Sequence, residues 1–437
     1  MVRYLKLLSV LLWFAVILSA CDSGSSSGQS FHRHKKTPTP TPTGSQSATP
    51  TPTLTPTATT TRTSTPTSTS TRTPTPTPTS TATCSVSVTG PLNVGRYAHT
   101  ATLFTSGPLM GKVLIAGGDG PGASLSLSSA ELYDPVSGTY SLTGSMTTGR
   151  VSHTATLLPS GKVLVAGGSD PTGHSIASAE LYDPATGTFT VTGSLNSTRS
   201  YHTATLTANG VLIAGGVGGP LVTLVPAAEL YDPVAGTFST IGDLTNPRQL
   251  QTDILFTAGP LANDVLLIGG VGSGFSLIAP TDLFTPVGNT FSASGSLLDP
   301  RRLHTSTLLI SGKVLVAGGV TMSTGNVSNT TEIFDPATAT FIAGPNMVNA
   351  KAYDAATLFT SGPRMGQVLI SASFTTGGFI TPNNDLYDPV ANSFSTTCNL
   401  LQTREQHTAT LLLNGKVLIT GGFIVGGGIT ECELYTP

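Results

Sequence analysis

The spacing of apolar and polar residues divides the chain into three stretches. Residues 1–20 place an apolar run, LLSVLLWFAVIL at 7–18, behind Arg3 and Lys6. Residues 37–83 are almost entirely Thr, Pro and Ser and contain no regular apolar positions. From residue 84 to residue 437, short runs such as TATLL and VLVAGG alternate with turns that contain Gly, Pro or Asp. Because β-prone runs between turn residues predict strands, we expect this last stretch to be all-β.

The β-rich stretch consists of seven copies of one unit, which start 49–54 residues apart. Each copy begins with a basic residue: Arg96, Arg150, Arg199, Arg248, Arg301, Lys351 or Arg404. Four runs follow, and in the first three copies Asp-Pro-x-x-Gly separates the third run from the fourth. This turn suits a tight hairpin, because Asp accepts local backbone hydrogen bonds and Gly supplies a positive φ. Four antiparallel strands in about 50 residues predict one blade, and therefore a seven-bladed β-propeller.

The two ends of the repeat complement each other. The seventh copy contains only three runs before the chain ends at Pro437. Residues 85–92, SVSVTGPL, match the fourth run of other copies, TFTVTGSL, and precede the first Arg. We therefore expect the N-terminal strand to complete the C-terminal blade and close the ring, which removes exposed sheet edges.

The Gly-Gly that ends the second run, followed by two aromatic residues around the Asp-Pro turn, resembles the kelch motif. The units RxxHTATLLxxGKVLVAGG are similar to the propeller domain of galactose-oxidase-like proteins, and the resemblance covers about residues 84–437. The second kelch aromatic is usually Trp. Here it is Tyr140, Phe189, Phe238, Phe291, Phe341 or Phe394.

The resemblance implies an enzymatic alternative. The copper site of galactose oxidase uses two His, two Tyr and a Cys cross-linked to a Tyr, and one His comes from an additional C-terminal domain. This chain ends with the propeller, and after the stalk only His174 lies outside a repeated position. We therefore expect no catalytic, cofactor-binding or metal-binding residues.

The front of the chain predicts membrane attachment. A positive start and a short apolar run are typical of a secretory signal and too short for a transmembrane helix. Leu18-Ser19-Ala20-Cys21 resembles a bacterial lipobox. We expect residues 1–20 to be a lipoprotein signal peptide and Cys21 to carry the lipid that anchors the protein on the extracytoplasmic side of the bacterial cell envelope. The alternative is an ordinary signal peptide with a chance cysteine.

Residues 21–83, first Ser/Gly-rich and then Thr/Pro-rich, contain no apolar set that could offset the entropy cost of folding. We expect them to form a disordered stalk that leans towards polyproline II and holds the propeller away from the membrane.

Charged residues make up only 10% of the chain. Even so, each copy has a basic residue at its start and an acid in its third run. The acids are Glu131, Glu180, Glu229, Asp282, Glu332, Asp385 and Glu433. Because buried charges survive only when they are paired and hydrogen-bonded, we expect ion pairs within or between blades.

Other residues depart from the repeat or invite a chemical role. The five repeated imidazoles are His99, His153, His202, His304 and His407, while Gln251 and Asp354 replace them in two copies. A ring of imidazoles could hold a metal, but blades would place them on opposite sides of the axis. We expect each imidazole to bond locally within its blade. The sixth copy also lacks Gly-Gly and reads Ser371-Ala372-Ser373.

Three cysteines follow Cys21: Cys84, Cys398 and Cys432. An extracytoplasmic location permits a disulfide, and an odd number leaves one thiol over. A bridge between Cys84 and Cys432 would join two strands of the closing blade, but the repeat alignment places them out of direct register. The sequence leaves the pairing open.

The formal net charge of −2 argues against binding of nucleic acid, which requires a basic surface. We expect a membrane-anchored, surface-displayed propeller that binds or scaffolds an unknown protein or carbohydrate ligand. The alternative is a galactose-oxidase-like or other extracytoplasmic enzyme with a site at the mouth of the propeller channel.

Overall fold

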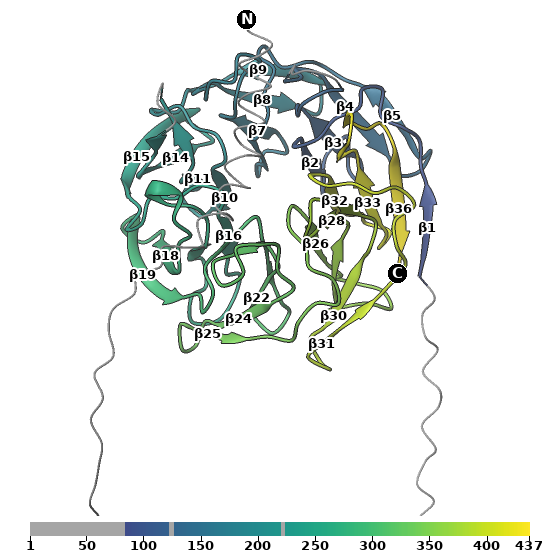
Figure 1. The fold of residues 1–437 in the computed structure, drawn as a ribbon. Helices are drawn as coiled ribbons and strands as arrows, with labels where there is room; N and C mark the ends of the chain where they lie inside the picture. Colours follow the sequence, from purple (N-terminus) through teal and green to yellow (C-terminus); the bar gives the residue numbers. More distant parts are fainter. Residues whose placement is uncertain (1–83, 122–125, 220–222) are drawn as a thin grey trace, which may run out of the picture. The chain divides into compact units, whose positions relative to one another are not determined.

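The computed structural model describes residues 84–121, 126–219 and 223–437. The predicted signal peptide, Cys21 and the stalk lie outside the described residues. Seven four-stranded antiparallel sheets form a ring (Figure 1), which confirms the predicted all-β, seven-bladed propeller. Within the described ranges, the only helical element is the 3-10 helix Ser273–Phe275. No helix in that part of the chain is long and apolar enough to cross a membrane.

The first strand of each blade lies nearest the axis, since the first strands of neighbouring blades contact one another around the ring. Blade 1 contains β2 (Thr100–Leu103), β3 (Val113–Ala116), β4 (Ala130–Asp134) and β5 (Thr139–Leu142). Blade 2 contains β6 (Thr154–Leu157), β7 (Val163–Ala166), β8 (Ala179–Asp183) and β9 (Thr188–Val191). Blade 3 contains β10 (Thr203–Thr207), β11 (Gly210–Ala214), β14 (Ala227–Asp232) and β15 (Thr237–Asp243). Blade 4 contains β16 (Thr252–Leu255), β17 (Val265–Ile268), β18 (Pro280–Thr285) and β19 (Thr290–Ser296).

The remaining blades follow the same order. Blade 5 contains β21 (Thr305–Leu308), β22 (Val314–Ala317), β24 (Thr331–Asp335) and β25 (Thr340–Ala343). Blade 6 contains β26 (Ala355–Leu358), β27 (Val368–Ser371), β30 (Asp385–Asp388) and β31 (Ser393–Thr396). Blade 7 contains β32 (Thr408–Leu411), β33 (Val417–Thr420), β36 (Cys432–Thr436) and β1 (Ser85–Val88).

Within the described ranges, four two-stranded ribbons accompany the blades. They pair β12 (Val217–Gly218) with β13 (Thr223–Leu224), β20 (Arg301–Arg302) with β23 (Val320–Thr321), β28 (Ser373–Phe374) with β29 (Ile380–Thr381), and β34 (Phe423–Ile424) with β35 (Gly427–Gly428). The ribbon formed by β28 and β29 begins where blade 6 lacks Gly-Gly. There, the amide of Asn384 accepts a hydrogen bond from the backbone N–H of Ala372.

The ring closes as the sequence predicts. β1 pairs antiparallel with β36, with Ser85 opposite Thr436 and Val88 opposite Glu433. In Figure 1 the first described strand therefore lies beside the last one. Because the closing blade combines both ends of the propeller, β36 is paired on both sides, and β1 takes the place that the fourth, outer strand has in the other blades.

A disulfide adds a covalent closure at this point. Cys84, directly before β1, is bonded to Cys398, which lies between blades 6 and 7. Cys432 is buried and free, so the bridge between Cys84 and Cys432 that the sequence brought into consideration is wrong. The antiparallel register explains this result, since it places Cys84 beyond Thr436, at the opposite end of β36 from Cys432.

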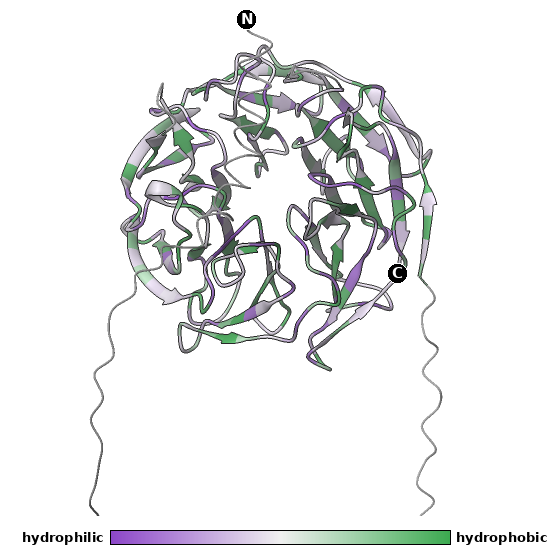
Figure 2. Ribbon diagram, in the orientation of Figure 1, coloured by the Kyte–Doolittle hydropathy of each residue, from purple (hydrophilic) through white to green (hydrophobic). Residues whose placement is uncertain are grey.

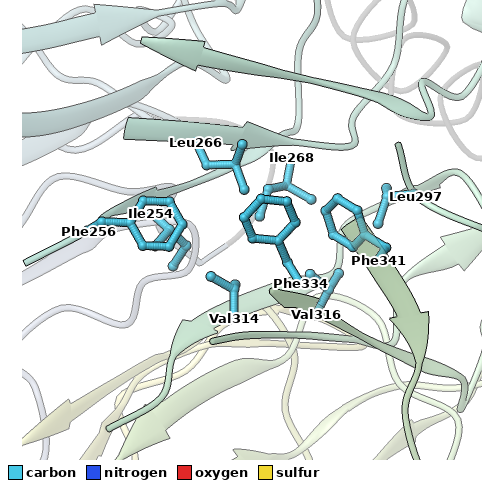
Figure 3. Close-up of a cluster of buried hydrophobic side chains, with 9 residues drawn as sticks. All are labelled: Ile254, Phe256, Leu266, Ile268, Leu297, Val314, Val316, Phe334 and Phe341. Carbon is cyan, nitrogen blue, oxygen red and sulfur yellow. The ribbon is translucent and has the colours of Figure 1, made fainter. Parts of the chain in front are cut away.

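Apolar side chains pack between neighbouring blades. The second strands are fully buried, as β7 (VLVA) illustrates, and the apolar character of the strands is visible in Figure 2. The cluster between blades 4 and 5, drawn in Figure 3, contains Ile254, Phe256, Leu266, Ile268, Leu297, Val314, Val316, Phe334 and Phe341. Each sheet thus buries both faces and depends on two neighbours for its core, as in other repeat folds.

The two aromatic positions of the motif form cross-strand pairs. Tyr182 and Phe189 lie opposite each other, with ring centroids 4.9 Å apart. In the five other blades that have both aromatics, the centroids lie 4.7–5.2 Å apart. Blade 7 instead places Val86 of β1 opposite Tyr435. These contacts stabilise the outer half of each sheet.

The Gly-Gly pair allows neighbouring blades to approach each other. Gly167 and Gly168 have φ values of 61° and 96°. A Cβ on Gly167 would lie 2.6 Å from the carbonyl oxygen of Arg199 and 2.8 Å from Cε1 of His202, both in blade 3. Glycine is therefore required both by the backbone conformation and by the closeness of the next Arg-x-x-His segment.

Candidate ligand site near the propeller axis

Buried arginines hold the start of six blades. In blade 2, Arg150 Nη2 lies 2.7 Å from Glu180 Oε1, and both side chains are fully buried. Arg150 Nη1 also donates to the carbonyls of Gly167 and Ser178, while Glu180 Oε2 accepts from the backbone N–H of Thr147. The pair therefore connects the entering linker, the end of the second strand and the third strand of one blade.

The predicted ion pairs recur within the blades. The five other pairs, with N–O distances of 2.5–3.0 Å, are Arg96–Glu131, Arg199–Glu229, Arg248–Asp282, Arg301–Glu332 and Arg404–Glu433. Blade 6 differs, because Lys351 Nζ donates to the carbonyl of Asn383 and forms no ion pair with Asp385 among the described residues. A lysine lacks the planar fork by which Arg binds the carboxylate and two carbonyls together.

The repeated His residues connect neighbouring blades, so the expectation of bonding within each blade is wrong. His153 Nε2 lies 3.1 Å from Thr100 Oγ1 in blade 1, and His202 Nε2 lies 3.0 Å from Thr154 Oγ1 in blade 2. The same contact to the preceding blade joins His99 to Thr408, His304 to Thr252 and His407 to Ser371. Burial and the nearby Arg150 lower the pKa of His153 to about 3, so the imidazole is neutral at pH 7.

A ring of backbone strain surrounds one end of the axis. The residue two positions after each starting Arg or Lys has a φ of 50–57°: Ala98, Ser152, Tyr201, Leu250, Leu303, Tyr353 and Gln406. Backbone hydrogen bonds join these residues from blade to blade, for example from Ala98 N–H to the Gln406 carbonyl and from Tyr201 N–H to the Ser152 carbonyl. Positive φ is costly for non-glycine residues and persists only where the surrounding structure enforces it.

Polar and aromatic side chains accompany this ring. Tyr97 Oη donates to Asp119 Oδ2 at 3.3 Å, and the Tyr97 ring contacts Phe423 with a centroid distance of 5.1 Å. Glu405 is only 4% exposed, and burial raises its pKa to about 7 despite a hydrogen bond from Gln406. A buried carboxyl that titrates near neutral pH is typical of a functional region, although it is not sufficient to identify one.

A polar pocket of about 300 Å³ lies beside this ring, and we call it the axial pocket. Its lining residues follow the positive-φ residues of blades 3–6 by one to three positions, at the start of the first strands. Side chains that line it are Thr203, Gln251, Thr252, Asp253, His304 and Ser306. Thr305 and Ala356 complete the wall. Hydroxyls, an amide, an imidazole and a carboxylate are thus gathered in one small volume, as in sites that bind small polar ligands.

Asp253 gives the pocket its charge. Its half-buried carboxylate accepts a hydrogen bond from Thr205 in the neighbouring blade. Burial raises the pKa of Asp253, while hydrogen bonds from Thr205 and Thr203 oppose the increase. No Lys, Arg or His within the described ranges forms an ion pair with it.

Sequence reasoning found part of this pocket. Gln251 was identified because it replaces the repeated His, and it lines the pocket, whereas Asp354 lies outside the pocket wall. Asp253 and Ser306 were missed, although a signal was present. Five of the seven copies have Ala at this position: Ala101, Ala155, Ala204, Ala356 and Ala409. Comparison of every column of the TATL run, and not only of its starting motif, would have found both residues.

The remaining deviating residues lie elsewhere. His174, in the loop of blade 2, is exposed and bonds Thr172 through Nδ1 at 2.7 Å. Ser371 is buried and bonds His407 Nε2 at 2.8 Å, which continues the contacts between blades. Neither residue contributes to the axial pocket.

The copper site implied by the resemblance does not fit these residues. In the described part of the chain, no group of three or more His, Cys, Asp and Glu side chains is arranged to hold a metal ion. The five repeated imidazoles lie in five different blades, and each bonds a hydroxyl of the preceding blade.

Comparisons with known proteins agree with this architecture. The kelch motif model matches residues 301–348. The chain is a seven-bladed propeller that carries a kelch motif. Among solved structures, it is similar to a fungal alcohol oxidase of the AA5 family in complex with copper, with a TM-score of 0.61 and 15% sequence identity. The match covers 81% of this chain and 76% of that chain. At this identity the likeness concerns the fold alone. No curated protein matches the sequence.

Proposed function

We propose that this protein is a lipid-anchored recognition module of the bacterial cell envelope, whose propeller binds a glycan in the axial pocket. The observation that carries the proposal is the wall of this pocket. There, Gln251, Asp253 and Ser306 replace the His and Ala residues of the repeat in a volume of about 300 Å³. Carboxylates, amides and hydroxyls are suitable partners for the hydroxyl groups of a sugar.

The proposed attachment rests on the sequence before the propeller. The lipobox-like Leu18-Ser19-Ala20-Cys21 supplies a lipidation site, and the Thr/Pro-rich segment supplies a spacer. A propeller held away from the membrane can present its axial pocket to an extracellular or periplasmic ligand. A second possibility for the same recognition function is that the propeller binds or scaffolds a protein partner.

A binding screen tests the function. Full-length protein in detergent is applied to a glycan array, together with the variants Asp253→Ala and Ser306→Ala, which restore the residue found in other blades. We expect the wild-type protein to bind particular glycans on the array, and we expect Asp253→Ala to bind the same glycans at least tenfold more weakly. A matched control, Asp183→Ala, alters a carboxylate at the end of β8 in blade 2, outside the pocket wall, and is expected to bind normally. If Asp253→Ala bound the glycans as tightly as the wild type, the proposed site would be wrong.

The attachment has its own test. Cells supplied with a labelled fatty acid should incorporate the label into the wild-type protein but not into Cys21→Ser, because the thiol is the only acceptor in the predicted lipobox. Labelling that persists in Cys21→Ser would contradict the anchor without affecting the binding proposal.

The alternative function is that of an extracytoplasmic enzyme, and metal analysis tests it. The fungal alcohol oxidase contains copper, and the likeness of folds suggests a direct comparison. Metal analysis of the purified protein is expected to give far less than one transition-metal ion per chain. Stoichiometric copper would replace the recognition function with an enzymatic one.

A further inference from the structure

The charge of the axial pocket is not neutralised by the protein. In the six blades with an Arg–carboxylate pair, the guanidinium is bound to the acid of its own third strand. Asp253 lies on a first strand and is not reached by any of these cations among the described residues. In the part of the chain that the structure describes, the hydroxyl of Thr205 donates a hydrogen bond to its carboxylate. The pocket therefore carries one negative charge when Asp253 is ionised.

The amide of Gln251 is held in place within the wall. Gln251 Nε2 donates to the carbonyl of Ala214 at 2.9 Å, which fixes the orientation of the amide. Gln251 is 7% exposed, and its Oε1 has no hydrogen-bond partner among the described residues. Thr305 Oγ1 likewise has none. Gln251 Oε1 can only accept a hydrogen bond, so the wall offers acceptors that lack donors.

His304 does not supply the missing positive charge. Its Nε2 lies 2.9 Å from Thr252 Oγ1, and Thr252 Oγ1 also contacts Ser306 Oγ at 2.6 Å. Burial and the nearby Arg301 lower the pKa of His304 to about 3. The imidazole is therefore neutral at pH 7 and held by the neighbouring strand.

We infer that the axial pocket binds a protonated primary amine flanked by hydroxyl groups, as in an amino sugar. This inference rests on the proposed glycan-binding function and specifies the ligand class. The ammonium group would pair with the Asp253 carboxylate, and its remaining N–H bonds would satisfy acceptors such as Gln251 Oε1. The ligand hydroxyls would bond Thr305 and Ser306. A volume of about 300 Å³ corresponds to a single small ligand and lies at the lower end of known ligand sites.

Three related sugars distinguish the effect of the ligand's charge on affinity from the effect of its shape. Glucosamine, N-acetylglucosamine and glucose are titrated calorimetrically into full-length protein in detergent at pH 7. We expect glucosamine to bind at least tenfold more tightly than the two neutral sugars, because only its ammonium group can form an ion pair with the Asp253 carboxylate. In Asp253→Asn, which keeps the shape of the side chain but removes its charge, the affinity for glucosamine should fall roughly tenfold to hundredfold.

The control is Asp183→Asn, which makes the same substitution at a partly exposed carboxylate paired with Lys162 in blade 2. It should leave the affinity for glucosamine unchanged. If the neutral sugars bind as tightly as glucosamine and Asp253→Ala abolishes their binding, the amine specificity is overturned while the glycan-binding function stands. If none of the three sugars binds, the inference is also overturned, and the glycan array then decides the broader function.

Discussion

Glu180 and Asp253 are both acids on strands of the same propeller, but the fold treats them in opposite ways. Glu180 is fully buried and is bound by Arg150 at 2.7 Å and by the backbone N–H of Thr147 at 2.9 Å. Asp253 lies in a pocket, and only hydroxyls hydrogen-bond its side chain. Glu180 occupies a position that is acidic in every blade, whereas Asp253 stands where five blades have Ala.

The difference separates scaffold from candidate site. A buried acid with a full set of partners fixes the local structure, and its removal leaves the partner charge uncompensated. An acid that the protein leaves without a counter-ion lowers stability, because desolvation disfavours its charged form. Asp253 is therefore better explained by a ligand than by folding, and the following substitutions test this distinction.

The largest loss is expected when a repeated ion pair is broken. Glu180→Ala leaves Arg150 buried without its carboxylate and removes the acceptor for the Thr147 N–H. We expect the free energy of unfolding to fall by about 3–5 kcal/mol, measured by urea denaturation. Asp183→Ala, in the same strand but on the surface, serves as the matched control. A midpoint for Glu180→Ala equal to that of the control would refute the scaffold role.

The disulfide is expected to have the next largest effect. Cys84 and Cys398 are 314 residues apart in sequence, so their bond restricts the unfolded chain strongly. Loss of a native disulfide typically costs about 2–5 kcal/mol, and the double variant Cys84→Ser/Cys398→Ser should melt at a correspondingly lower temperature. Cys432→Ser is the control for cysteine replacement. Reducing agent should lower the melting temperature of the wild type but not of the double variant. If neither the reducing agent nor the double substitution lowers the melting temperature, the stability of the closed ring does not depend on this bond.

The disulfide also illustrates how far the sequence could predict the structure. Seven copies, the Arg–acid pattern and the match of SVSV to TFTV were sufficient for the blades, for six of the seven ion pairs and for the closure by β1, whereas the pair expected between Lys351 and Asp385 is not formed. These features depend on contacts that the repeat itself encodes. Cys84 and Cys398 occur once each, so no second copy reveals their proximity. The register of β1 on β36 argues against Cys432 as the partner of Cys84, but only the structure shows that Cys398 lies beside Cys84.

The candidate site was harder to predict for the same reason. The alignment on Arg-x-x-His drew attention to Gln251 and Asp354 but passed over Asp253, three residues after the ring of strained backbone. Bonding of His153 to Thr100 in the preceding blade was not expected either. Contacts between blades depend on which face of a first strand meets its neighbour, and periodicity within one unit does not specify that face.

Asp354 permits a test by pH. Burial raises its pKa to about 7, partly opposed by Lys351. The folded state therefore binds this proton more tightly than the unfolded state, where an Asp titrates near 4. The stabilising contribution is complete below pH 4 and is lost as the pH rises through 7. Asp354→Asn should remove this loss and stabilise the protein at pH 8 by about 2 kcal/mol. One pKa unit corresponds to 1.36 kcal/mol, but the gain is reduced because the new amide is buried where the carboxyl oxygens have no hydrogen-bond partner among the described residues.

The measurement is the difference in unfolding free energy between Asp354→Asn and the wild type at pH 4, 6 and 8. This difference cancels the contribution of Glu405, which also has a pKa raised to about 7. A difference that is constant across this range would contradict the raised pKa of Asp354.

Asp253→Ala tests the other side of the comparison. Because burial raises the pKa of Asp253, loss of the carboxylate should leave the stability unchanged or increase it by up to about 1 kcal/mol. The same variant should lose glycan binding. Such a gain of stability with loss of binding is opposite to the outcome for Glu180→Ala. Marked destabilisation by Asp253→Ala would place Asp253 in the scaffold.

The smallest effect is expected at the exposed ion pair between Lys162 and Asp183, although its N–O distance of 3.0 Å resembles that of the buried pairs. The side chain of Lys162 is 41% exposed, so water and salt already screen the charge. We expect Lys162→Ala to change the free energy of unfolding by no more than about 0.5 kcal/mol, and to change it less at 1 M salt. Glu180→Ala should keep most of its effect at this salt concentration. If both variants responded to salt equally, burial would not be what distinguishes the two kinds of ion pair. The contrast between Glu180 and Asp253 would then have to rest on their partners alone.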